Sequence, residues 1–192
     1  ADLETPVSAF LKLRPHGAVF LLESVERGIQ VGRYSFIGIT PDSIVTLCDE
    51  TVTTQRNGDV HQQDVDPADP FGPVRAALAN GGNLQTEDLP GPFAGAVGYI
   101  SYEIVRYFEN IPLPEEDPLG LPDYQFLFPR TIAVFDHVKS EIEILTLPPE
   151  GNLDESYEAD SQEIKTMLAA LEKPLPPQAD IPVEAMDSSP VS

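Results

Sequence analysis

The hydrophobic pattern along the chain predicts strands of more than one kind. Five consecutive apolar residues, Ala18 to Leu22, indicate a strand buried on both faces. Polar and apolar residues alternate over residues 33–39 and again over Glu141–Ile144, which is typical of strands with one buried face. Altogether, strands are predicted over residues 18–24, 33–39, 43–49, 51–55, 60–65, 93–100, 124–135 and 141–147.

Apolar residues three or four positions apart, together with end signals, predict the helices. These are expected over residues 6–13, 71–79, 102–109 and 153–171. Pro6 is well placed in a first helical turn, and Asp69 is a candidate N-cap for the second helix. In the last helix Met167 and Leu171 share one face.

Turn signals separate these elements and point to a fold class. Pro41-Asp42 marks a bend, and Asn57-Gly58 is a strong hairpin signal. Strands with interspersed helices, and without regular βαβ alternation, predict an α+β fold with mostly antiparallel, sandwich-like sheets and a few flanking helices. Residues 1–172 are expected to form one domain, and the proline-rich residues 173–192 a linker or tail.

The composition and charge of the chain argue against some classes of binding partner and indicate a cellular compartment. The 192 residues carry a net charge of −21, with 32 acidic against 11 basic residues. This charge argues against binding to nucleic acid or to an anionic membrane surface, which need clustered Lys and Arg. No apolar run approaches the roughly 20 residues of a membrane-spanning helix, and the N-terminus is too acidic for a signal peptide. A cytoplasmic protein is therefore expected.

One polar cluster lies where the first two predicted strands would meet. If these strands pair antiparallel, Glu23, Ser24 and Arg33 gather at one end of a hairpin. The three groups suit a zwitterion, with its carboxylate on Arg33 and its ammonium on Glu23 or on backbone carbonyls. The alternative is a strand-end ion pair whose neighbouring hydroxyl satisfies the turn, and spacing alone favours this alternative.

Two further segments raise functional hypotheses that their spacing does not support. The spacing of the glycine-rich segment 91–99 matches neither the dinucleotide-binding fingerprint nor the P-loop. A strand whose glycines allow another backbone to approach closely is the better interpretation. Asp136-His137 suggests a catalytic dyad, but a hairpin turn is the favoured interpretation. With no metal-ligand spacing either, the chain is predicted to hold no catalytic and no metal site.

Several longer segments match a known family in order over residues 4–147. They are Glu4–Leu13, Phe20–Glu26, Gly32–Gly38, Gly95–Tyr99, Val105–Glu109, Asp117–Asp123 and Val134–Val138. With them the chain resembles anthranilate synthase component I, a chorismate-utilising enzyme. Aminodeoxychorismate and isochorismate synthases share the architecture, but the opening Thr5-Pro6-Val7 and the segment Leu21–Ser24 favour the anthranilate branch.

The resemblance implies a parent enzyme of tryptophan biosynthesis. That enzyme is a lyase that converts chorismate and ammonia to anthranilate and pyruvate, with Mg²⁺ as its cofactor and a glutamine amidotransferase subunit, component II, as its ammonia source. The resemblance places this chemistry in a C-terminal chorismate-binding domain beyond this sequence. The chain is thus expected to be an N-terminal regulatory domain, without a cofactor of its own and inactive alone.

The resemblance also implies a ligand for the hairpin cluster. Glu23, Ser24, Arg33 and Tyr34 fall where the family has part of its L-tryptophan feedback-inhibition site, and the C-terminal domain supplies the rest. This favours the functional interpretation of the cluster. Two alternatives stay open: a purely structural or interaction half without ligand binding, and the N-terminal domain of aminodeoxychorismate synthase component I.

Overall fold

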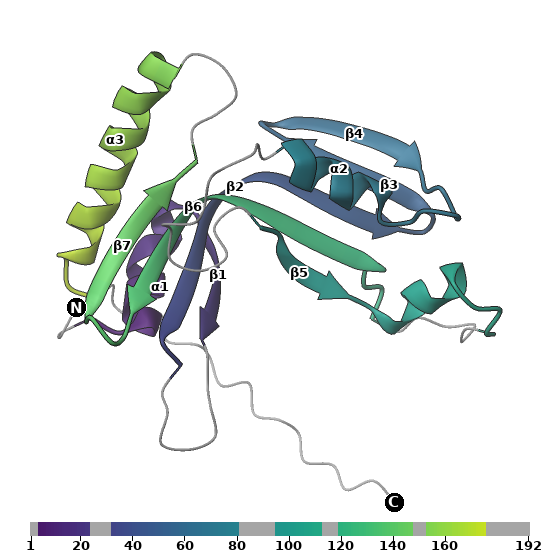
Figure 1. Ribbon diagram of the computed structural model, residues 1–192, viewed down its shortest axis with the longest axis horizontal. Coiled ribbons are helices and arrows are strands. Elements are labelled where there is room, and N and C mark those ends of the chain that lie inside the picture. The colour runs from purple at the N-terminus through teal and green to yellow at the C-terminus, as the bar shows by residue number, and fades with distance from the viewer. Residues whose placement is uncertain (1–3, 24–31, 81–94, 113–118, 148–152, 176–192) are drawn as a thin grey trace, which may run out of the picture.

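The computed structural model describes residues 4–23, 32–80, 95–112, 119–147 and 153–175 (Figure 1). The helical elements are α1 (Pro6–Leu13), η1 (Arg14–His16), α2 (Gly72–Asn80), η2 (Tyr102–Tyr107) and α3 (Leu153–Leu171), where η marks a 3₁₀ helix. The strands are β1 (Ala18–Glu23), β2 (Tyr34–Cys48), β3 (Thr51–Arg56), β4 (Asp59–Asp64), β5 (Val97–Ile100), β6 (Tyr124–Asp136) and β7 (Glu141–Thr146).

All strands of the described residues join one antiparallel sheet. The long strands β2 and β6 pair along their whole length, from Tyr34 opposite Asp136 to Leu47 opposite Tyr124. At one end of this pair β1 adds to β2 and β7 adds to β6. At the other end β3 and β4 extend from β2, while β5 pairs with β6 (Figure 1). The predicted α+β class is confirmed.

The bend predicted at Pro41-Asp42 lies inside a continuous strand. Thr40 has a φ of +48°, which is rare for a β-branched residue, and its N–H donates to the Gly17 carbonyl at 2.9 Å. The pairing of β2 with β6 shifts by one residue between Pro41 and Ser43. This irregularity is a β-bulge, and it reverses which residues of β2 point to which face of the sheet.

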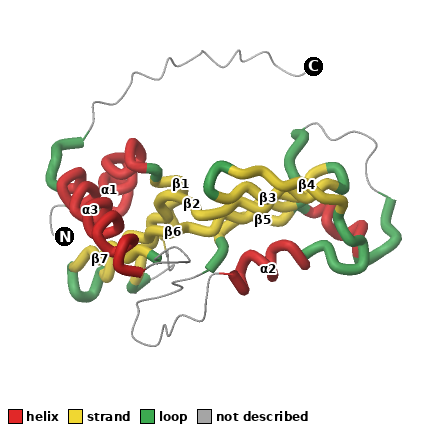
Figure 2. Tube along the Cα trace, turned by 90° about the horizontal axis from the view of Figure 1, so that it is seen from above, coloured by secondary structure: helices red, strands yellow, loops and turns green. Residues whose placement is uncertain are grey.

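The bulge divides the sheet into two halves that are covered on opposite faces. Figure 2 shows α1 and α3 on one side of the sheet and α2 on the other. The core between the sheet and the helices α1 and α3 is built from residues of both: Ala9, Leu13, Ala18, Ile37, Ile39, Ala133, Phe135, Met167 and Ala170. The core on the side of α2 is built from Val45, Leu47, Val52, Val65, Val74, Tyr124 and Phe128, of which Val74 belongs to α2 itself.

A third apolar cluster lies on the face of the first half that points away from α1 and α3. Its buried residues are Ile132 and Val134 of β6. Partly buried neighbours pack against them: Tyr34, Phe36, Leu145 and Leu147. We call these six residues the open-face cluster.

Two sequence predictions need correction. The interpretation of β1 as buried on both faces is wrong, because Val19 and Leu22 are 42% and 43% exposed. Both side chains belong to β1, which pairs only with β2 and so forms an edge of the sheet. The α-helix predicted over residues 102–109 is the shorter 3₁₀ helix η2.

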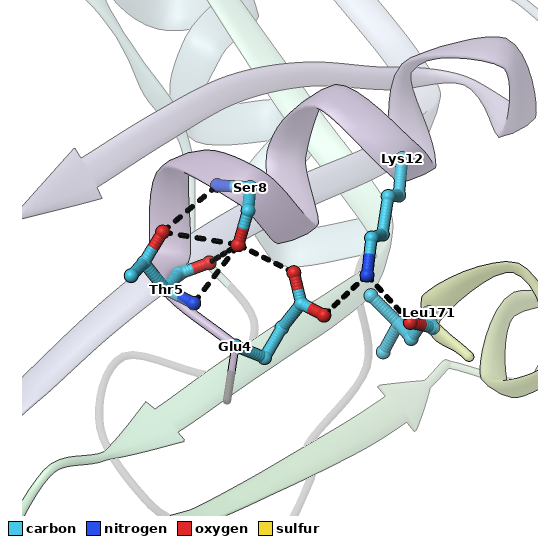
Figure 3. Close-up of polar contacts among 5 residues, drawn as sticks. All are labelled: Glu4, Thr5, Ser8, Lys12 and Leu171. Atoms are coloured by element: carbon cyan, nitrogen blue, oxygen red, sulfur yellow. Dashed lines mark hydrogen bonds and ion pairs between the residues drawn. The ribbon is translucent and has the colours of Figure 1, made fainter. Parts of the chain in front are cut away.

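Hydrogen bonds and an ion pair hold both ends of α1. Thr5 and Ser8 form a capping box, in which the Ser8 N–H donates to Thr5 Oγ1 at 3.1 Å and the Thr5 N–H donates to Ser8 Oγ at 2.9 Å (Figure 3). Lys12 pairs with the Glu4 carboxylate and donates to the Leu171 carbonyl at 2.8 Å. The first helix is thereby bonded to the C-terminal end of α3.

The glycine-rich segment is a close-packed strand where the structure describes it. A Cβ at Gly98 would lie 1.9 Å from the Gln125 carbonyl oxygen and 2.8 Å from Phe126 Cα, both on β6. A Cβ at Gly95 would meet no atom within 4 Å. The strand interpretation is confirmed at Gly98, while residues 91–94 of the segment lie outside the described residues.

We predict that Lys12→Met lowers the free energy of unfolding by about 1–3 kcal/mol, because it leaves a partly buried Glu4 carboxylate unpaired and a carbonyl without its donor. Urea denaturation of the 192-residue chain measures the change. Lys165→Met, at an exposed position of α3, is the control and should stay within about 0.5 kcal/mol of the wild type. Equal stability of the two variants would contradict the bonding described.

We predict that Gly98→Ala destabilises the chain by roughly 1–3 kcal/mol, since the clash is with backbone atoms that cannot rotate away. Gly95→Ala is the matched control and should unfold at a urea concentration close to that of the wild type. If the two alanine variants unfold at the same concentration, β5 does not pack on β6 as described.

Candidate functional site

The first two strands pair as the zwitterion hypothesis requires. Strand β1 runs antiparallel to β2, with Glu23 opposite Ser35. Arg33 directly precedes β2. Ser24 and the residues up to 31 lie outside the described residues. The structure therefore places three of the four predicted site residues: Glu23, Arg33 and Tyr34.

Arg33 is held by a carboxylate from a distant part of the chain. Its Nη2 and Nε donate to Asp136 Oδ2 at 3.0 and 3.3 Å. Its guanidinium carbon lies 4.8 Å from the centre of the Tyr34 ring, a cation–π distance. The second oxygen of Asp136 accepts hydrogen bonds from the N–H groups of Val138 and Lys139 at 3.0 and 3.1 Å. Asp136 therefore links the start of β2 to the β6–β7 turn.

The contact with Arg33 keeps Asp136 ionised. The hydrogen bond from Arg33 lowers the pKa of the Asp136 carboxyl, and the turn N–H groups lower it further. The same hydrogen bond raises the pKa of Arg33. The Asp136 side chain is only 6% exposed, whereas 52% of the Arg33 side chain is exposed. The pair therefore presents its guanidinium, and not its carboxylate, to the outside.

Glu23 lies on the opposite side of the sheet from this pair. Side chains alternate along a strand, so Glu23 shares the face of its partner Ser35, which is the face covered by α1 and α3. Tyr34 belongs to the open-face cluster on the other side. The structure thus brings Arg33 and Tyr34 together and places Glu23 on the neighbouring strand, facing the other way.

A second polar contact forms on the face of Glu23. Ser35 Oγ and His137 Nε2 share a hydrogen bond at 2.8 Å, and the His137 ring stacks on Phe135 at 6.3 Å. Ser35 is 2% exposed, so it is poorly placed to act as a nucleophile. The hydrogen bond links β2 to the turn after β6. It does not resemble a serine nucleophile activated for acyl transfer.

Sequence reasoning missed the partners of the hairpin. The turn interpretation of Asp136-His137 is confirmed, because Asp136 caps the turn between β6 and β7. Asp136 also accepts from Arg33, which directly precedes β2, and His137 shares a hydrogen bond with Ser35 of β2, over 103 and 102 sequence positions. Only the register of β2 on β6 brings them there, and no local motif encodes that register.

The chemistry available at this end of the sheet is recognition of an anion. A guanidinium that uses one edge for Asp136 keeps donors on another edge for a ligand carboxylate. Among the described residues, no group of three or more His, Cys, Asp or Glu side chains could hold a metal ion. None of the helices that the structure describes is long and apolar enough to cross a membrane.

A further ion pair lies at the opposite end of the sheet. Arg106 of η2 pairs with Asp123, and burial raises the pKa of Asp123 although Arg106 acts in the other direction. Beside this pair, the hydroxyl of Ser101 is buried and has no hydrogen-bond partner among the described residues. Arg106 and Asp123 lie in segments that carry the family resemblance, and here they hold η2 against the sheet.

Comparison with known proteins finds relatives named anthranilate synthase component 1. The chain is 37% identical over 169 residues to anthranilate synthase component 1 of Acetivibrio thermocellus, an alignment that covers 87% of this chain and 34% of that protein. It is 42% identical over 164 residues to the protein of the same name from Thermus thermophilus, covering 83% of this chain and 32% of that protein. The chain spans about a third of the length of the curated relatives it matches.

A solved structure and a family model agree with these relatives. The crystal structure of anthranilate synthase component I from Streptococcus pneumoniae TIGR4 superimposes with a TM-score of 0.54 at 24% identity, over 88% of this chain and 35% of that one. At this identity the likeness shows the fold. The family model described as chorismate binding enzyme matches residues 52–190. The chain therefore belongs to the chorismate-binding enzyme family, and within that family it is similar to anthranilate synthase component I.

Proposed function

We propose that this chain is the N-terminal regulatory domain of an anthranilate synthase component I and supplies part of its L-tryptophan feedback site. The observation that carries the proposal is Arg33, whose half-exposed guanidinium is oriented by Asp136 and by the ring of Tyr34. An oriented guanidinium at a strand end suits the carboxylate of an amino acid. The choice of tryptophan follows from the resemblance of the hairpin residues to the family's feedback-inhibition site.

In this proposal the ligand spans the end of the hairpin. The carboxylate of tryptophan binds Arg33, and its ammonium donates to backbone carbonyls or to Glu23. Because the register turns Glu23 toward the other face, backbone carbonyls are the better acceptors. Bound tryptophan inhibits only by binding more tightly to an inactive state of the enzyme than to an active one.

The activity of the whole enzyme belongs to the same proposal. A longer polypeptide would convert chorismate to anthranilate and pyruvate as a cytoplasmic lyase, with Mg²⁺ in its chorismate-binding domain and ammonia from the component II amidotransferase. The described residues contribute no reacting group to that step. Their role is to bind the inhibitor and to support the catalytic domain.

One observation favours a second candidate function, a purely structural half without ligand affinity. The open-face cluster presents partly buried Tyr34, Phe36, Leu145 and Leu147 beside Arg33. Such a surface suits packing against more protein. Half of a pocket also binds weakly, because ordering and desolvation costs are not recovered. The aminodeoxychorismate branch keeps this fold and changes the product, so a product assay of the longer enzyme separates the two branches.

We predict that Ser24→Phe relieves tryptophan inhibition in the full-length enzyme, since a bulky ring at the hairpin end occupies the ligand's place. The half-inhibiting tryptophan concentration should rise at least tenfold, while turnover without tryptophan stays unchanged. Ser24→Ala is the matched variant, which removes the hydroxyl without adding bulk, and it should have a smaller effect. Unaltered inhibition of the phenylalanine variant would rule out the site.

We predict that the pure 192-residue chain makes no anthranilate from chorismate, ammonia and Mg²⁺, because it brings no catalytic group of its own. Fluorescence detection of anthranilate measures this. Titration calorimetry of the chain with tryptophan should show weak binding or none. Measurable turnover would overturn the domain assignment, whereas tight tryptophan binding would show that the described half of the pocket suffices.

A further inference from the structure

Asp136 performs two tasks with its two oxygen atoms. Oδ2 accepts both hydrogen bonds from Arg33, and Oδ1 accepts the two N–H groups of the β6–β7 turn. The turn hydrogen bonds fix the carboxylate on the sheet. The fixed carboxylate in turn fixes the guanidinium, which is otherwise the end of a long and half-exposed side chain.

The hydrogen bonds to Asp136 use one particular edge of the guanidinium. Nε and Nη2 of Arg33 form its side edge. The end edge, made by Nη1 and the second hydrogen of Nη2, keeps its donors in the bidentate geometry that a carboxylate fits. Tyr34 covers one flat side of the group, so the free edge has a defined direction.

We propose that Asp136 is a positioning residue, which orients Arg33 so that its free edge receives the carboxylate of the amino-acid ligand. The inference rests on the proposed function and adds to it a residue outside the hairpin that determines ligand affinity. Asp136 acts through Arg33 and does not touch the ligand.

Two effects of losing the Asp136 charge oppose each other. Without the carboxylate, Arg33 samples several rotamers, and the affinity of the site falls in proportion to the fraction of time spent in the competent one. Against this, a negative charge on the order of 6 Å from the ligand carboxylate is removed, but at a half-exposed site water screens that repulsion strongly. Positioning is the larger effect, and losing it weakens binding.

Asp136→Asn separates the two tasks of the residue. The amide oxygen can still accept the N–H groups of Val138 and Lys139, so the turn keeps its cap. The charge that holds Arg33 is lost. Asp42→Asn is the control, because Asp42 of β2 forms an ion pair with Arg56 of β3 at 3.2 Å in another part of the sheet.

The main experiment measures tryptophan inhibition of the full-length enzyme. We expect Asp136→Asn to raise the half-inhibiting concentration about 3–10-fold, and Asp42→Asn to leave it unchanged. If the wild type is inhibited and Asp136→Asn is inhibited equally or more strongly, the inference is overturned and the proposed function stands. If tryptophan does not inhibit the wild type, the proposed function fails and the inference fails with it.

A double-mutant cycle distinguishes positioning from a general structural effect. In an Arg33→Met background, Asp136→Asn should change the half-inhibiting concentration no further, because there is no guanidinium left to orient. An equal rise in both backgrounds means that Asp136 acts through the turn, and this overturns the inference. Should the asparagine variant fail to fold, Asp136→Ser replaces it, as serine also accepts turn N–H groups.

The ion pair itself is tested on the 192-residue chain without ligand. Arg33 lowers the pKa of Asp136, so Arg33→Met should raise that pKa toward the ordinary value of an aspartate. Carbon-13 NMR of the carboxyl group during a pH titration measures it. A pKa that does not move on removing Arg33 shows that the pair is absent in solution, which overturns the inference.

Discussion

The pairing of β2 with β6 is the constraint on which the rest of the described structure depends. Strands β1, β3, β5 and β7 attach directly to one of these two, and β4 attaches through β3. The two partners come from distant parts of the chain, so their register is a purely tertiary property. It also assembles the candidate site, because it places Asp136 opposite Tyr34 and therefore next to Arg33.

Local sequence signals were enough for most elements. The start of α1, the Asn57-Gly58 hairpin and the long α3 all appear where periodicity and turn residues predicted them. The predicted burial of one strand was wrong. The apolar run of β1 indicates a fully buried strand, yet Val19 and Leu22 are partly exposed. The number of neighbours of a strand depends on sheet order, and short apolar runs do not encode sheet order.

The candidate site divides in the same way between what is local and what is not. Antiparallel pairing of Glu23 with the strand after Arg33 follows from the hairpin, and sequence spacing predicted it. The carboxylate next to Arg33 could not be predicted in this way. Spacing offered Glu23, ten residues away, whereas Asp136 is 103 positions away. Some residues in the segments that carry the family resemblance hold helices in place. Thr5 and Ser8 cap α1, and the ion pair of Arg106 with Asp123 holds η2.

The bulge between Pro41 and Ser43 also limits how this sequence can vary. It acts as a frame shift in the alternation of inward and outward side chains, so Ile37 and Val45 can both be buried although they are covered on opposite faces. Removing one residue there restores an uninterrupted alternation and turns Val45 and Leu47 away from α2. Chains that share this fold can therefore change the residues of β2 more readily than the number of residues between its two cores.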